Sequence, residues 1–289
     1  MIGIERYYFL FGLAIIWIAF AAVYDIRKRE VPNWLNFSLV GFALAYRAFY
    51  ASAFSDFGFF AYGLAGFAVF FVIANLFYYS KVFAGGDAKL LMGIGAVLPI
   101  SSLIDLVYVG GGFMMLMFFI GAAYSIVYSM IIAIRNKDKF GSEFRKNLSD
   151  KKYWLVVPAI FVLLVAVLYI LIGIPLEMLA VIILFSIVSY FLFVYLRAVD
   201  VCMIKLVAPG KLTEGDWLHE NVKLKNGLVR KSVHGLSVED ILKLRKAGKK
   251  VLIKEGVPFV PAILLAFLAM VFFLAVLGFD FWNLVWFLS

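Results

Sequence analysis

Two aspartates, Asp25 and Asp87, stand where apolar stretches of the chain meet polar segments. Asp25 follows the apolar residues 7–24, and Asp87 precedes the apolar residues 88–103. Ionisable side chains in apolar stretches are costly in lipid and therefore mark candidate functional sites. Two carboxyl groups that meet at one depth can share a proton and hold a water molecule, one acting as base and the other as acid. The pair therefore predicts a hydrolytic site.

The helix ends should also influence the charge of the two carboxyl groups. Asp87 lies near the amino terminus of its predicted helix, where the positive end of the dipole favours an ionised carboxylate, and Asp25 lies near a carboxyl terminus, where the opposite holds. We therefore expect Asp87 to hold the water and Asp25 to carry the proton, although the members of a coupled pair can exchange roles.

The elements that position these aspartates are predicted membrane-spanning helices. The 289 residues are 65% hydrophobic and 16% charged, with a mean hydropathy of +1.01, whereas a soluble domain is about 45–50% apolar and ~25% charged. This composition excludes a soluble globule and predicts an all-α polytopic membrane protein. About eight stretches approach the ~20 residues that a spanning helix needs: residues 7–24, 34–51, 57–79, 88–103, 106–134, 154–172, 178–196 and 257–279.

Positive charge is concentrated in alternate connections between these stretches. Most of the 27 Lys and Arg residues follow the first, third, fifth and seventh stretches. Because basic connections remain in the cytosol, we expect a multi-pass protein of the cell membrane, with both termini outside and both aspartates at the cytosolic face. This topology accounts for the net charge of +9. The lipid bilayer is thus an expected partner, and nucleic acid is not.

The chain divides into a transmembrane region with seven spans at residues 1–196, a soluble module at residues 197–256, and a final helix with the carboxyl terminus at residues 257–289. In the module, Asn226 and Gly227 predict a type I′ hairpin, Ser237 predicts a helix start, and Gly248 predicts its end. Residues 250–254 predict a strand. We therefore expect a small cytosolic α+β module between the last two spans.

Metal and disulfide chemistry are not expected. The chain has one cysteine, Cys202, and two histidines. A single cysteine excludes a disulfide framework, and so few soft ligands do not make a zinc site. We predict no metal and no cofactor.

Two segments around the aspartates resemble a known family. Residues 22–33 contain Ala-Val-Tyr-Asp, a basic cluster and Val-Pro-Asn, and residues 84–91 are Ala-Gly-Gly-Asp-Ala-Lys-Leu-Leu. They are similar to the GxGD-type prepilin and preflagellin (prearchaellin) peptidases, the archaeal branch in particular, with Ala84 in place of the first glycine. The resemblance implies a membrane aspartyl endopeptidase with Asp25 and Asp87 as catalytic residues. It implies removal of short basic leader peptides, the class III signal peptides, from archaellin or type IV pilin precursors at the cytosolic face.

The two glycines before Asp87 predict an open backbone at this point. Gly85 and Gly86 have no Cβ, so the chain can turn sharply into the helix and a substrate strand can approach closely. We expect their role to be access to Asp87.

Three further residues are candidates for a supporting role. Tyr24 could orient the neighbouring Asp25 or could be an interfacial belt tyrosine. Lys89 could contact substrate or Asp87, or could extend to the lipid headgroups. Glu30 follows Asp25 within a few residues and could receive a basic leader.

Two other function classes remain open from the sequence. Tyr24-Asp25, the Gly-Gly-Asp segment and Pro261-Ala262-Ile263 would also suit an intramembrane protease of the presenilin and signal-peptide-peptidase type. A proton-coupled transporter could use the same aspartates as relay groups, although transport sites usually lie near the midplane between repeats. Depth separates the three, because carboxylates near the cytosolic boundary favour the leader peptidase and carboxylates in mid-bilayer favour either alternative.

Overall fold

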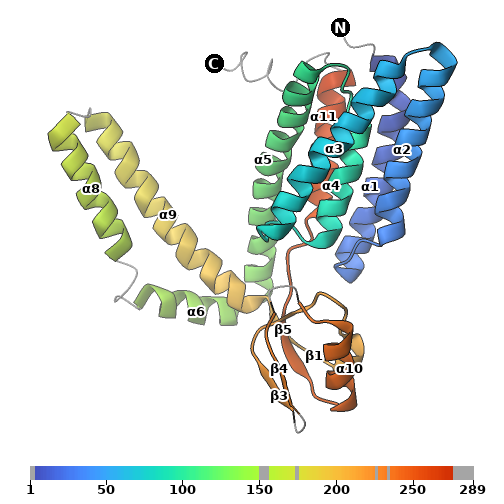
Figure 1. Cartoon of the computed structure of the whole chain (residues 1–289). Helices are drawn as coiled ribbons and strands as arrows, with labels where there is room; N and C mark the ends of the chain where they lie inside the picture. Colours follow the sequence, from blue (N-terminus) through green and yellow to red (C-terminus); the bar gives the residue numbers. More distant parts are fainter. Residues whose placement is uncertain (1–3, 150–155, 173–175, 225–226, 233–234, 276–289) are drawn as a thin grey trace. The chain divides into compact units, whose positions relative to one another are not determined.

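The computed structural model describes residues 4–149, 156–172, 176–224, 227–232 and 235–275 (Figure 1). The chain forms two compact units, one made of Met1–Ile126 with Val257–Ser289 and the other of Val127–Gly256. Asp25 and Asp87 both belong to the first unit.

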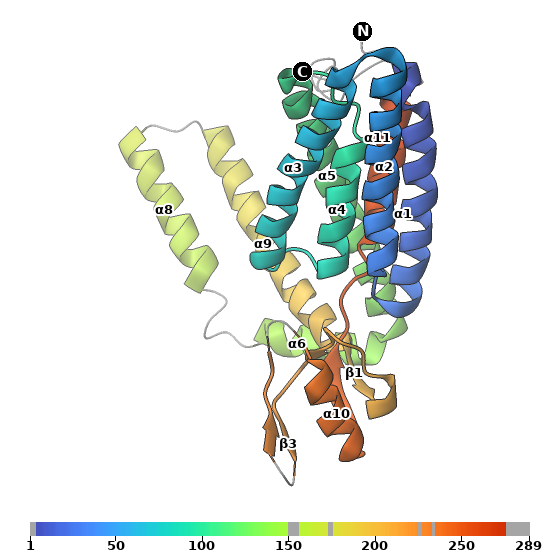
Figure 2. The same ribbon diagram turned by 45° about the vertical axis from the view of Figure 1, so that its right-hand side comes forward.

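The first unit is a bundle of apolar helices that run side by side in both ribbon views (Figures 1 and 2). Two of its helices begin at residues that suit a helix start. Pro32 precedes the second helix, where its fixed φ is suitable, and the Asp56 side chain accepts a hydrogen bond from the Phe59 N–H at the start of the third. The elements are η1 (Ile4–Tyr7), α1 (Tyr8–Lys28), α2 (Asn33–Phe54), α3 (Phe57–Tyr79), α4 (Gly85–Val97), α5 (Leu103–Arg135, up to Ile126 in this unit) and α11 (Val260–Ala275).

The short helix α4 lies inside this bundle. It contacts α1, α2 and α3, and most of its side chains are buried. Its approach to α3 depends on glycine, because a Cβ on Gly66 would collide with the Gly95 carbonyl oxygen and a Cβ on Gly95 would collide with Phe70. Small residues at such positions allow two backbones to pack closely.

A buried arginine holds the far end of α4. Arg47 on α2 is fully buried, and its guanidinium donates to the carbonyl oxygens of Ala96 at 2.8 Å, Phe59 at 2.7 Å and Leu98 at 2.6 Å. A cation at a helix carboxyl terminus is favoured by the dipole. Gly63 leaves the room for it, since a Cβ there would collide with the Arg47 side chain. Arg47 thus joins α2, α3 and α4.

Among the described residues, five helices are long and apolar enough to cross a membrane: Ile4–Lys28, Asn33–Phe54, Phe57–Tyr79, Leu103–Arg135 and Ala180–Cys202. Helix α4 has 13 residues and is therefore about 20 Å long. This is shorter than the hydrocarbon core of a bilayer, which is about 30 Å thick. The predicted helical, polytopic character is confirmed, whereas the number of eight spans remains a prediction.

The second unit contains the helices α6 (Lys137–Ser149), α8 (Val156–Ile172) and α9 (Leu176–Cys202). Helix α6 lies in a segment that we expected to be a connection. Its aromatic residues pack, with the Phe140 ring 5.6 Å from the Phe144 ring and 5.6 Å from the Tyr195 ring of α9. Apolar residues four apart lie on one helix face, so α6 covers part of α9.

The same unit contains the small mixed module. Strands β1 (Ile204–Val207), β5 (Val251–Lys254) and β2 (Trp217–Leu218) form one antiparallel sheet in that order, and β3 (Val222–Leu224) pairs with β4 (Gly227–Val229). The elements η2 (Pro209–Lys211) and α10 (Val238–Lys246) complete it. The predicted hairpin pairing, the helix start at Ser237 and the final strand are confirmed, whereas Asn226 lies outside the described residues. The limits of the module remain a prediction.

Candidate active site

Asp25 lies in the last turn of α1 with only 6% of its surface exposed. It belongs to the buried face of the helix, together with Ala14, Ile18 and Ala21. Its Oδ2 atom accepts a hydrogen bond of 3.0 Å from the backbone N–H of Val260. A residue 235 positions later in the chain therefore holds this carboxyl group.

Val260 is the first residue of α11, so Asp25 lies at the amino terminus of that helix. The first N–H groups of a helix have no partner within it, and they carry the positive end of its dipole. Pro261 follows and offers no N–H, so Val260 supplies the donor. Asp25 thus lies between the carboxyl end of α1 and the amino end of α11. Our expectation that only an unfavourable helix end acts on Asp25 was incomplete.

Asp87 is the third residue of α4 and is 9% exposed. Helices α1 and α4 are in contact, and Val31, which follows α1, lies against Gly86 next to Asp87. Figure 1 shows the end of α1 and the start of α4 at the same end of the bundle. The structure therefore brings the two predicted aspartates into one buried neighbourhood.

The turn before Asp87 is shaped by packing. A Cβ on Gly86 would lie 3.2 Å from the Cβ of Val31 and 3.3 Å from its backbone nitrogen, whereas Gly85 has only Tyr78 at 3.5 Å. The absence of a Cβ at Gly86 therefore admits the loop after α1, whereas its role in substrate access remains a prediction. Ala84 has φ −69°, a value open to any residue, so the site does not need a glycine there.

Asn36 on α2 also contacts this turn. Its side chain is fully buried, and Nδ2 donates to the Gly86 carbonyl oxygen at 3.4 Å. Its Oδ1 atom is buried and accepts no hydrogen bond within the described part of the chain. A buried acceptor without a donor is unusual and calls for a ligand or a water.

The other predicted residues occupy different positions. Lys89 Nζ donates to Asn33 Oδ1 at 2.7 Å, which ties the first turn of α4 to that of α2. Tyr24 lines a groove on the outer face of α1, with Lys28 Nζ 5.4 Å from its ring centroid. Glu30 is exposed in the loop between α1 and α2.

An aromatic cluster fixes the segment that leads into α11. Phe259 lies 5.4 Å from Phe83, measured between ring centroids, and its ring occupies the space that a Cβ on Gly121 would need. Phe83 in turn contacts Phe77 at 5.2 Å. Because Phe83 precedes the Asp87 turn and Phe259 precedes Val260, this cluster holds together the two segments that carry Asp87 and the donor to Asp25.

Sequence reasoning missed Val260 and Asn36. A backbone N–H has no sequence signal, although the proline at 261 does mark the start of a helix. Asn36 had a signal, since it is a polar amide one turn into an apolar stretch.

Comparison with known proteins supports the same region. Residues 12–134 match the Type IV leader peptidase family. The preflagellin peptidase of Methanococcus maripaludis is 26% identical over 138 residues, which is 43% of this chain and 59% of that protein. The preflagellin peptidase of Methanocaldococcus jannaschii is 32% identical over 89 residues, 31% of this chain and 38% of that protein, and that of Methanococcus voltae is 26% identical over 138 residues, 44% and 57%.

These alignments leave a substantial part of each relative uncovered, because the chain spans between 38% and 59% of their lengths. No solved structure matches the chain significantly. The family match includes Asp25 and Asp87, and it confirms the resemblance drawn from the segments around them. Over residues 12–134 the chain is similar to the Type IV leader peptidase family.

Proposed function

We propose that this protein is a membrane aspartyl endopeptidase of the GxGD type, with Asp25 and Asp87 as its catalytic residues. The observation that carries the proposal is that two buried carboxyl groups stand on helices α1 and α4, which contact each other, with Val31 after α1 packed against Gly86 beside Asp87. Two carboxylates in one site hold a single proton between them at neutral pH. Such a pair can supply a base and an acid at once.

The reaction would be peptide-bond hydrolysis. The ionised carboxylate takes a proton from a water molecule, whose oxygen attacks the scissile carbonyl carbon, while the protonated carboxyl donates to the carbonyl oxygen. Collapse of the tetrahedral intermediate breaks the C–N bond, the departing amine takes the proton that the first carboxylate removed from the water, and a hydroxyl of the intermediate returns its proton to the second carboxylate. The N–H of Val260 would hold Asp25 in place through these steps, and the buried Asn36 Oδ1 would accept a hydrogen bond from the water.

The depth of the aspartates favours this reaction over the alternatives. Asp25 lies three residues before the end of α1, about 5 Å along its axis, and Asp87 is in the first turn of α4. An intramembrane protease or a proton-coupled transporter would need its carboxyl groups farther into the membrane. We infer that this end faces the cytosol and that both chain termini lie outside, because Arg27, Lys28 and Arg29 follow directly.

We infer that the substrates are precursors with short basic leaders, of the archaellin or type IV pilin kind. Three related proteins are named preflagellin peptidases, and they align over part of their length. The exposed Glu30 offers an acidic contact for a basic leader in a loop that is otherwise basic.

The test is cleavage of a purified precursor by the detergent-solubilised full chain, with identification of the new amino terminus by mass spectrometry. We expect the wild type to cut directly after the basic leader, and Asp25→Asn and Asp87→Asn to lose cleavage by at least about 1,000-fold. Asp105→Asn is the matched control. Asp105 is also a helix-end aspartate, but it binds Ser101 and should retain nearly full activity.

Appreciable turnover by either asparagine variant would refute the paired mechanism. Cleavage at a position within an apolar helix, and not after the leader, would instead favour an intramembrane protease.

A further inference from the structure

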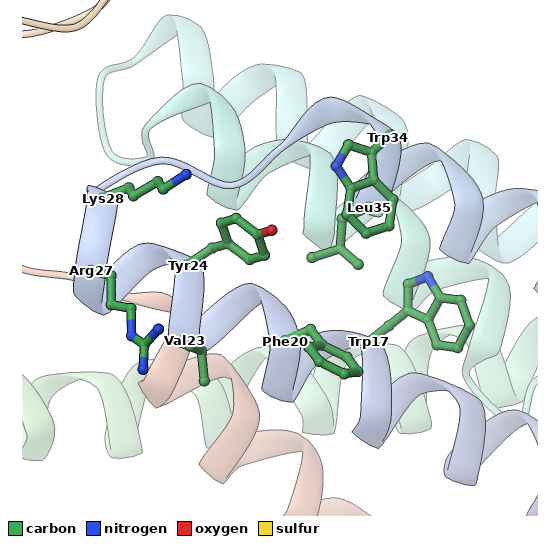
Figure 3. Close-up of a pocket in the computed structure, with 8 residues that line it drawn as sticks. All are labelled: Trp17, Phe20, Val23, Tyr24, Arg27, Lys28, Trp34 and Leu35. Atoms are coloured by element: carbon green, nitrogen blue, oxygen red, sulfur yellow. The ribbon is translucent and has the colours of Figure 1, made fainter.

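A groove on the outer face of the first unit lies between the end of α1 and the start of α2 (Figure 3). Its volume is about 640 Å³, within the ~300–1,000 Å³ range of ligand sites. The lining residues are Trp17, Phe20, Val23, Tyr24, Arg27, Lys28, Trp34 and Leu35. Nothing in the proposed peptidase reaction uses this groove.

The lining combines an apolar wall with a cationic mouth. Trp17, Phe20, Tyr24 and Trp34 form the wall, and the only charged members are Arg27 and Lys28, both at the helix end. Within the described part of the chain neither cation forms an ion pair, and Lys28 lies over the Tyr24 ring. Figure 3 shows the Lys28 side chain extending along the loop toward the groove. The mouth is therefore complementary to an anion with an apolar tail.

The length of the groove along α1 is close to the thickness of the hydrocarbon region of one leaflet. From Lys28 to Trp17 the groove follows α1 for 11 residues, which is about 16 Å of helix, close to half of the ~30 Å hydrocarbon core. The cations would then lie at headgroup depth and the aromatic wall along the chain region. Both flanking helices are among those long and apolar enough to cross a membrane.

The groove is separate from the candidate active site. On α1 the groove residues Trp17, Phe20 and Tyr24 are on average about 105° around the helix axis from Asp25 and the buried face that carries it, at ~100° per residue. A peptide in the groove would therefore not present its backbone to Asp25. A basic leader would also be repelled by Arg27 and Lys28.

We propose that this groove is a binding site for a membrane lipid with an anionic phosphate headgroup. Arg27 and Lys28 bind the phosphate, and one lipid chain lies along Trp17, Phe20, Tyr24 and Trp34. Basic pockets between spanning helices on the cytosolic side bind anionic headgroups in this way. A lipid in this position would brace the loop between α1 and α2, whose Val31 packs against Gly86.

The test uses the two groove tryptophans as reporters. The full chain is placed in phosphatidylcholine nanodiscs and titrated with phosphatidylglycerol or phosphatidylcholine whose chains carry bromine, a contact quencher of tryptophan fluorescence. The Trp17→Phe/Trp34→Phe variant supplies the background from the remaining tryptophans. We expect brominated phosphatidylglycerol to quench the groove signal at a much lower mole fraction than brominated phosphatidylcholine.

Charge removal gives the decisive comparison. Each basic residue near an anionic headgroup strengthens binding about fivefold, so Arg27→Gln/Lys28→Gln should weaken the preference for phosphatidylglycerol up to about 30-fold. The control Arg145→Gln/Lys146→Gln removes the same charge from exposed positions of α6 and should keep the preference. Lys28→Arg should also keep it, which guards against a loss caused by misfolding.

Three results would overturn the proposal. They are equal quenching by the two lipids, an unchanged preference in the Arg27→Gln/Lys28→Gln variant, and displacement of the brominated lipid by equimolar glycerol phosphate, which would mean that the site recognises a free anion without the lipid chain.

Discussion

The hydrogen bond from the Val260 N–H to Asp25 can be removed by one substitution that should leave the start of α11 in place. Val260 is the first residue of α11, a position where proline is well tolerated because its N–H has no partner within the helix. The substitution Val260→Pro therefore deletes the donor while the helix can still begin there. The preceding residue, Phe259, acts as the helix cap, since its carbonyl accepts from the N–H groups of Ala262 and Ile263. A cap residue has extended backbone, which a following proline permits.

The size of the effect follows from the nature of the bond. It is 3.0 Å long, buried, and accepted by a carboxylate, and hydrogen bonds to charged groups contribute about 1.5–3 kcal/mol. If Asp25 needs this donor to keep its position and charge in the transition state, Val260→Pro should lower kcat by about 10- to 100-fold, at 1.36 kcal/mol for each tenfold. The assay is single-turnover cleavage of a precursor at saturating enzyme.

Val260→Ala is the matched control, because it keeps the N–H and trims the buried side chain. It should lower the melting temperature but keep kcat within about threefold of the wild type. A Val260→Pro enzyme that is folded and cleaves as fast as Val260→Ala would refute the role given to this donor.

Three further substitutions test the scaffold and the water site. Arg47→Met should destabilise the protein by about 3–5 kcal/mol, seen as a lower melting temperature, because three buried hydrogen bonds from a cation are lost; an unchanged melting temperature would contradict this. Gly66→Ala should destabilise by about 1–3 kcal/mol through collision with the Gly95 carbonyl, whereas Gly12→Ala, with open space around it, should stabilise slightly; equal melting temperatures of the two would be inconsistent with the packing described. Asn36→Leu should leave stability close to that of the wild type while cleavage falls about tenfold, since it removes a buried unpaired acceptor together with the 3.4 Å hydrogen bond to the Gly86 carbonyl; full activity would exclude Asn36 from the reaction.

The sequence located both aspartates because each stands at a recognisable boundary. Asp25 ends an apolar stretch and Asp87 begins one, and two helix ends on the same side of a membrane must lie at similar depth. A similar depth for the two aspartates therefore remains a prediction of the sequence, whereas the contact between α1 and α4 could not be predicted from it. That contact depends on the close packing of α4 in the bundle, which no local pattern of residues specifies.

Other features could not be predicted from short segments of the sequence, because they depend on residues far apart in the chain. Arg47 stands within an apolar stretch, away from the basic connections, and only the fold shows that it holds the end of α4. Helix α6 was missed because its charged residues resemble a loop, although Phe140 and Phe144 have helical spacing. The packing of Gly86 could not be predicted for a related reason, since its neighbour Val31 is 55 positions earlier in the chain and cannot be inferred from the glycine itself.

The most direct test of the central claim is whether Asp25 and Asp87 act as one unit. Single-turnover cleavage rates of Asp25→Asn, Asp87→Asn and the double variant form a cycle that measures their coupling. Residues that act together are strongly non-additive, so we predict that the double variant cleaves no more slowly than the slower single variant. Losses that multiply in the double variant, or a single variant that retains wild-type activity, would contradict the account.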